Sequence, residues 1–249
     1  MVGLEGAIAY GGFLYLKALW DTWRSHRFGI YGAFGTGKTT LSRQLSTSGE
    51  LEDFSTQADT ATEHPFDPEL GRYLPPPSTR KRVALKNTQT LKVTAKTLIS
   101  TDIGGQMKYF DLWLEDMVER NVECVIWVVD HRHLLDENDT SQQVAFKRFV
   151  EAIITGDYGF TDKALIKKAR KYKPQVVGLV ANKADLWLDE LWEKHWMTTR
   201  MNGHPIFKTF IPDLARLQSR QIPTLKRPIS ALRNWSCEET IWDIMEAKI

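Results

Sequence analysis

The stretch GAFGTGKT, at residues 32–39, decides the fold. A strand-like run at 26–31 precedes it, and a helical apolar pattern follows over 41–45. Glycines between a strand and a helix let the backbone curl, so that successive N–H groups point inward and bind phosphate oxygens. We therefore expect a phosphate-binding loop, whose contributing residues are Gly35, Thr36, Gly37, Lys38, Thr39 and Thr40.

Two residues of this loop carry specific expectations. Lys38 would lie along the β and γ phosphates, and the Thr39 hydroxyl would ligate Mg²⁺. The loop alone does not separate ATP from GTP, nor a kinase from a hydrolase.

A second motif, DIGGQ at 102–106, follows a β-rich run at 97–101. Asp102 would stand at the carboxyl end of a strand, where ligands of open α/β sheets bind, and would hold Mg²⁺. Gly105 would offer a backbone N–H to the γ-phosphate, a bond lost when that phosphate leaves. Gln106 would then orient the attacking water. Lys38 and Gln106 are the predicted catalytic residues.

The motifs NKAD (182–185) and SAL (230–232) predict the choice of base. The first follows the apolar run at 175–181, typical of a buried strand. The Asp185 carboxylate would accept from the ring N–H and the exocyclic amine of guanine, which adenine lacks. Asn182 would tie this segment to the phosphate loop, and the Lys183 stem would cover the base. The expected contacts to the guanine oxygen come from Ser230, Ala231 and Leu232.

In this order, the four motifs resemble those of the Ras-like GTPase superfamily, over roughly residues 27–249. The residues at 102–106 resemble those of the Arf and Gα branch, and the run at 124–130 resembles the Arf-type central strand. The resemblance implies an α/β, P-loop NTPase G domain with three layers and a mostly parallel sheet of roughly six strands. It also implies a molecular switch that binds GTP, GDP and Mg²⁺, hydrolyses GTP and engages a protein effector or regulator.

The sequence departs from the family pattern at the phosphate loop and in two insertions. Phe34 stands where many members carry glycine, and its ring would crowd Gln106 or an incoming arginine, so we expect slow hydrolysis. The insertions lie near 48–78 and 190–225.

The family also needs a threonine in the first switch that closes over Mg²⁺. Thr79 is favoured as this third metal ligand, with Thr60 and Thr62 as alternatives. Arg80 or Arg82 would supply charge to the transition state in cis, although a solvated basic edge is the favoured interpretation.

The remaining segments bear on partners and location. Residues 1–26 form an apolar extension, expected to pack as a helix on the domain or, as an alternative, to lie in a membrane interface. A net charge of +2 is too balanced to argue for nucleic acid, which is not expected as a partner. Two cysteines without a disulfide spacing fit the cytoplasm. Asp139 with Gln142 would cap the helix that follows them.

Two rival functions remain open. One is an interaction module that holds a guanine nucleotide and hydrolyses it negligibly, which Phe34 and the insertions favour. The other is a P-loop kinase or ATPase, which Asp185 argues against.

Overall fold

The computed structural model describes residues 28–46, 68–73, 96–101, 105, 110–188 and 203–247. Its strands are β1 (Phe28–Tyr31), β2 (Pro68–Tyr73), β3 (Lys96–Thr101), β4 (Cys124–Val129), β5 (Val176–Ala181) and β6 (Thr224–Pro228). Its helices are α2 (Lys38–Ser46), α4 (Phe110–Glu119), α5 (Arg132–Leu135), α6 (Ser141–Thr155), α7 (Lys163–Ala169), α8 (Ala184–Trp187), α10 (Pro205–Lys208), α11 (Ile211–Ser219) and α12 (Cys237–Glu246). Strands and helices alternate along much of the chain, as in an α/β domain.

Four strands form a parallel sheet in the order β1-β4-β5-β6. One row of paired residues crosses it from Ile30 through Ile126 and Gly178 to Leu225. Because all four strands point the same way, their carboxyl ends meet at one edge of the sheet. The strands predicted before the phosphate loop and before Asn182 are confirmed as β1 and β5.

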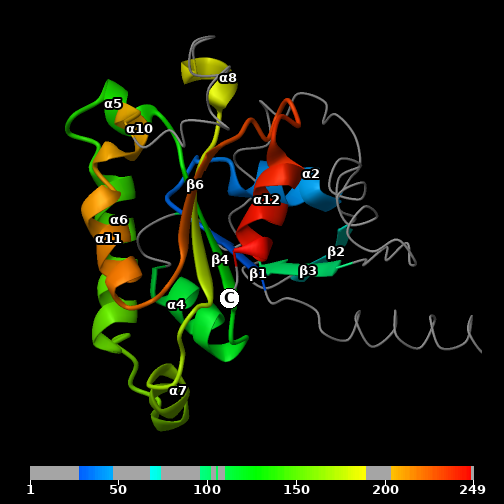
Figure 1. The fold of residues 1–249 in the computed structure, drawn as a ribbon. Coiled ribbons are helices and arrows are strands. Elements are labelled where there is room, and N and C mark those ends of the chain that lie inside the picture. The colour runs from blue at the N-terminus through cyan, green and yellow to red at the C-terminus, as the bar shows by residue number, and fades with distance from the viewer. Residues whose placement is uncertain are drawn as a thin grey trace, which may run out of the picture.

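The strands β2 and β3 form a separate antiparallel pair, in which Pro68 lies opposite Thr101. β3 lies next to β1 (Figure 1), but the two are not joined in a hydrogen-bonded ladder. The described residues thus divide their strands between two sheets, and a single sheet of about six strands is not confirmed.

Helices cover both faces of the parallel sheet, which gives the predicted three layers. In Figure 1, α2 and α12 lie on one side and α4, α6 and α11 on the other. All residues of β4 and β5 are buried, as expected for strands covered on both faces. Within β4, Ile126 packs in the cluster that includes Leu41 of α2, whereas Trp127 packs in the cluster that includes Phe149 of α6.

Trp127 is the centre of an aromatic cluster on the α6 face. Its ring stacks on Phe149 at 4.8 Å and meets Phe146 and Trp113 edge-on, at 5.5 and 5.7 Å between ring centroids. Such contacts add to the burial of apolar area and fix ring orientation. They hold β4 in place, and Asp130 directly follows its carboxyl end.

Several predictions from the sequence fall outside the described residues. These are the extension at 1–26, most of the first insertion, and Thr60, Thr62, Thr79, Arg80, Arg82, Asp102 and Gln106. The range given for the second insertion, 190–225, includes α10 and α11, which connect β5 to β6. In the part of the chain that the structure describes, no helix is long and apolar enough to cross a membrane.

Candidate nucleotide site

The predicted phosphate loop lies between β1 and α2, as its glycines require. Gly37 has a φ of +86°, and a Cβ there would come within 2.3 Å of the Asn182 side-chain nitrogen. Only glycine fits this turn, because any side chain would be strained and would collide. The Gly37 carbonyl then accepts from the Leu41 amide at 2.9 Å, which begins α2.

Two polar side chains of the loop form hydrogen bonds with the loop's own backbone. Both the Thr36 hydroxyl and the Lys38 ammonium donate to the Ala33 carbonyl at 3.0 Å, and all three residues are buried. The Lys38 side chain therefore folds back over the curve of the loop. Thr39 and Thr40 follow in the first turn of α2 and are half-buried. A helix of this length adds the positive end of its dipole to the loop.

Gly105 is the described residue of the second motif, and it lies directly against the loop. A Cβ at Gly105 would be 2.5 Å from the Lys38 Nζ atom and 2.5 Å from the Phe34 amide nitrogen. The structure therefore brings Gly105 to the part of the loop that sequence analysis assigns to the last phosphate.

Asn182 joins three segments that are far apart in the sequence. Its amide nitrogen donates to the Thr36 carbonyl at 2.9 Å, and its amide oxygen accepts from the Ala231 N–H at 2.9 Å. Asn182 is 2% exposed, so both bonds are shielded from water. The predicted tie between this motif and the phosphate loop is present, and the same side chain holds the SAL segment as well.

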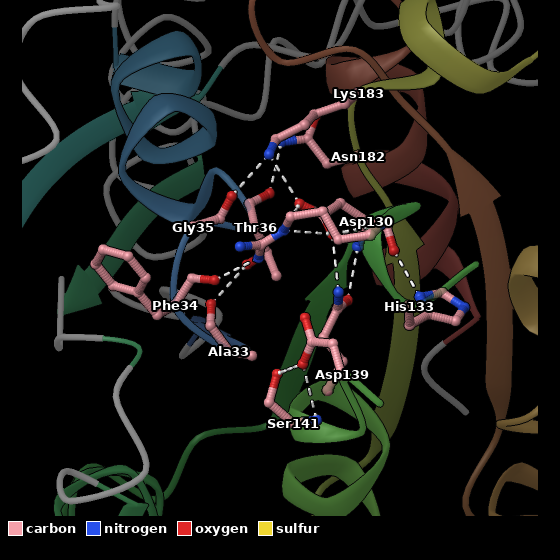
Figure 2. A network of polar contacts seen from close by, with 12 residues as sticks. Ala33, Phe34, Gly35, Thr36, Asp130, His133, Asp139, Ser141, Asn182 and Lys183 are labelled. Atoms are coloured by element: carbon pink, nitrogen blue, oxygen red, sulfur yellow. Dashed lines mark hydrogen bonds and ion pairs between the residues drawn. The ribbon is translucent and has the colours of Figure 1, made fainter. Parts of the chain in front are cut away.

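Lys183 occupies the left-handed region, with a φ of +60°, and its side chain returns to the loop. The ammonium donates to the Gly35 carbonyl and to Asp130 Oδ2, both at 2.8 Å. Figure 2 shows Lys183 and Asn182 together beside Gly35 and Thr36. The loop and the base motif thus share direct contacts through two consecutive side chains.

Asp185 is exposed, and a buried serine orients its carboxylate. The Ser230 hydroxyl donates to Asp185 Oδ1 at 2.5 Å. Two backbone hydrogen bonds between Ser230 and Trp235, at 3.1 and 2.9 Å, close the turn that carries Ala231 and Leu232. The Ala231 N–H is directed to Asn182, and Leu232 is half-buried. The predicted base-reading residues therefore lie together at one end of β5 and β6.

Sequence reasoning missed Asp130, the residue that follows β4. Its carboxylate is fully buried and accepts from Lys183, from Arg132 Nε at 2.9 and 3.0 Å, and from Gln142 Nε2 at 2.8 Å. Burial opposes ionisation, but the bonds and charges of Lys183 and Arg132 outweigh it and hold the pKa of Asp130 below its usual value. An acidic residue at the carboxyl end of a buried strand is the signal that would have found it.

The predicted cap formed by Asp139 and Gln142 is present for Asp139, which binds the first amide of α6, but is wrong for Gln142. Thr140 is the residue before the first turn of α6 and makes no side-chain capping bond. Asp139 accepts from the Ser141 amide, while the Gln142 side chain is buried and exchanges two hydrogen bonds of 2.8 Å with Asp130. A buried carboxylate needs donors more than an exposed helix end does, because water satisfies the latter.

Two solved structures are similar to this chain. The small GTPase Arl6 (BBS3) from Trypanosoma brucei, with the bound nucleotide analogue GppNp, is 18% identical with a TM-score of 0.45, over 90% of this chain and 97% of that one. A bacterial selenocysteine-specific elongation factor, EF-Sec, is 15% identical with a TM-score of 0.45, over 90% of this chain but 29% of that one. Neither a protein-family model nor a curated protein matches the chain. Because these identities and TM-scores are modest, the function of the site has to be inferred from its own contacts.

Those contacts define one assembled site at the carboxyl edge of the parallel sheet. A glycine-rich loop at the start of a helix offers N–H groups and an ammonium to an anion. An exposed carboxylate, fixed by a buried hydroxyl, lies on the neighbouring segment and offers acceptors. The arrangement suits a ligand that has phosphates at one end and hydrogen-bond donors at the other.

Proposed function

We propose that this chain binds GTP and GDP with Mg²⁺ and hydrolyses GTP to GDP and phosphate, as a molecular switch. The observation that carries the proposal is the double hydrogen bond of Asn182, which joins the phosphate loop to the SAL segment. It supports a single site for phosphates and base, because motifs that matched the sequence by chance would not be expected to lie in contact in the fold.

The phosphate end has the donors that a polyphosphate needs. The positive end of α2, the loop amides and the Lys38 ammonium would bind the β and γ phosphates. Thr39 would ligate Mg²⁺, with Asp102 and Thr79 as the further ligands that the sequence predicts. When bound, the ion would neutralise charge on the phosphate oxygens.

The base end has the acceptor that distinguishes guanine. Asp185 would accept from the ring N–H and the amino group of guanine, while Ser230 holds the carboxylate in place. Adenine has no matching donors and would leave the carboxylate unpaired, so we expect steep discrimination against ATP.

Hydrolysis and switching would depend on the segment that Gly105 begins. A water oriented by Gln106 would attack the γ-phosphorus, the bond to the β–γ bridging oxygen would break, and GDP and phosphate would form. The position of Gly105 against Phe34 and Lys38 supports a contact that depends on the last phosphate. A protein effector or regulator would then distinguish the two nucleotide states, in the cytoplasm or at a membrane surface that residues 1–26 contact.

One observation favours a second function, a guanine-nucleotide-bound interaction module with negligible hydrolysis. Phe34, which lies within the phosphate loop, is 51% exposed. A ring in that place would obstruct Gln106 or an arginine supplied by another protein, and either effect would slow turnover.

Binding and turnover separate these functions. Fluorescent GDP and GTP are titrated into purified protein with Mg²⁺ and competed with ATP, and phosphate release is then followed over time. Guanine-selective binding with release that Gln106→Leu abolishes supports the enzyme. Selective binding without release supports the module, and equal competition by ATP contradicts guanine recognition. Flotation of the full chain with vesicles, compared with a chain that starts at Arg24, tests the membrane contact.

A further inference from the structure

Arg132, at the start of α5, reaches back to the phosphate loop. Its Nε atom donates to both oxygens of Asp130, at 3.0 and 2.9 Å, and its Nη2 atom donates to the Phe34 carbonyl. The guanidinium therefore bridges a buried carboxylate and the backbone of the loop. None of the four nucleotide motifs contains this arginine.

The loop is held at two consecutive carbonyls by two cations. Arg132 donates to the Phe34 carbonyl and Lys183 to the Gly35 carbonyl, and both side chains are fixed by Asp130 (Figure 2 shows this carboxylate beside the loop). Because each carbonyl shares a rigid peptide plane with the N–H of the next residue, fixing these two carbonyls also fixes the orientation of the two N–H groups that follow them. Two cations on one carboxylate also leave one positive charge beside the loop.

The guanidinium is in close contact with the loop at Gly35. This residue has a φ of +74°, and a Cβ there would be 2.8 Å from the Arg132 Nη1 atom. Glycine at this position therefore serves the arginine as well as the turn, because a side chain would displace the guanidinium.

We propose that Arg132 is a positioning residue, which holds residues 34–35 of the loop in the conformation that binds a nucleoside di- or triphosphate. It acts through the Phe34 carbonyl, with Asp130 as its anchor. This inference rests on the proposed function for the identity of the nucleotide, but it concerns the phosphate end alone. Loss of Arg132 therefore weakens polyphosphate binding and leaves base recognition unchanged.

The test compares Arg132→Gln, Arg132→Lys and the control Arg216→Gln in the full chain. Arg216 matches Arg132 in exposure, 37% against 36% for the side chain, and likewise pairs with carboxylates, but on α11. Calorimetry gives the affinities for GDP, GTP and inorganic pyrophosphate, and an NMR titration gives the affinity for guanosine. Thermal unfolding without ligand shows that each variant is folded.

We expect Arg132→Gln to bind GDP, GTP and pyrophosphate about 10- to 100-fold more weakly, since it loses a hydrogen bond from a charged donor. Guanosine affinity stays at the wild-type value, and Arg216→Gln behaves as wild type. Arg132→Lys keeps the charge but not the fork that spans Asp130 and Phe34, so it restores only part of the loss.

Two results overturn the inference. Wild-type affinity of Arg132→Gln for GDP and pyrophosphate shows that the loop needs no such support. An equal loss for GDP and guanosine shows a general structural role. Failure of the proposed function looks different: the wild-type protein then binds pyrophosphate but does not bind guanosine or prefer GDP to pyrophosphate. The effect of Arg132 on pyrophosphate affinity still decides the inference.

Discussion

Removal of the Asn182 amide is the sharpest perturbation that the structure offers. Asn182→Ala deletes two buried hydrogen bonds of 2.9 Å and leaves the Thr36 carbonyl and the Ala231 N–H without this partner. A neutral hydrogen bond contributes about 1 kcal/mol, and a buried group left unsatisfied costs about 1–3 kcal/mol. We therefore expect a loss of about 2–4 kcal/mol in the free energy of unfolding.

Thermal unfolding of the ligand-free protein, followed by circular dichroism, measures this loss. For a chain of this size, 1 kcal/mol shifts Tm by about 2–4 °C, so Asn182→Ala should unfold about 4–16 °C below wild type. Asn138→Ala is the matched control, because Asn138 is exposed in a turn far from these contacts along the chain. Its Tm should stay within the error of the measurement.

The aspartate variant separates the two bonds. Asn182→Asp keeps an acceptor for the Ala231 N–H but replaces the donor to Thr36 with a carboxylate oxygen, which faces a carbonyl in a buried place. We expect Asn182→Asp to be at least as destabilised as the alanine variant at neutral pH, because its buried carboxylate would face the Thr36 carbonyl oxygen, which repels it. If both variants unfold at the wild-type temperature, the Asn182 side chain does not hold the segments together. The proposal that the phosphate loop and the SAL segment form one site is then contradicted.

Three further predictions concern the site, the core and the response to pH. Gly105→Ala places a methyl carbon 2.5 Å from the Lys38 Nζ atom. The variant should lower the rate of phosphate release from GTP about 100-fold and leave the affinity for GDP unchanged. An unaltered release rate in a stopped-flow phosphate assay contradicts the contact. Trp127→Ala empties the aromatic core and should cost about 3–5 kcal/mol in urea unfolding, and a loss below about 1 kcal/mol contradicts the packing. Burial lowers the pKa of His133, so the unfolded chain takes up this proton first as the pH falls. The stability that the neutral His133 contributes is complete above about pH 6.5 and is lost as the pH falls below it. His133→Gln should therefore flatten the change in the free energy of unfolding between about pH 7 and 5. Equal slopes for the variant and the wild type contradict this prediction.

The parts that the sequence predicts well are those with local signals. The phosphate loop is marked by glycines at positions of positive φ, and the buried strands β4 and β5 are continuous apolar runs. The position of Asn182 at the end of β5 follows from the same run. Because the carboxyl ends of parallel strands share an edge, the meeting of loop and base motif also follows from the order of elements.

The parts that the sequence does not predict depend on contacts between distant segments. Gln142 has the spacing of a helix cap, yet the buried Asp130 carboxylate takes its side chain. Arg132 lies two residues after Asp130 in the sequence, but its contact with the Phe34 carbonyl arises only when β1 and β4 pair. Neither choice could be made from spacing alone, because each depends on which polar group would otherwise remain unsatisfied.

The electrostatics of the Asp130 cluster connect these observations with function. A net charge of +2 over the whole chain gives no indication of a phosphate site. Locally, the buried carboxylate of Asp130 fixes Arg132 and Lys183 against the loop, and one positive charge is left over. Because the carboxylate is removed from water, its hold on the two cations is screened less than a surface ion pair would be. Arg132 and Lys183 therefore both hold the loop carbonyls in place and give the loop a positive field. Because Asp130 fixes both cations, substitution of Asp130 should weaken phosphate binding more than loss of Arg132 alone.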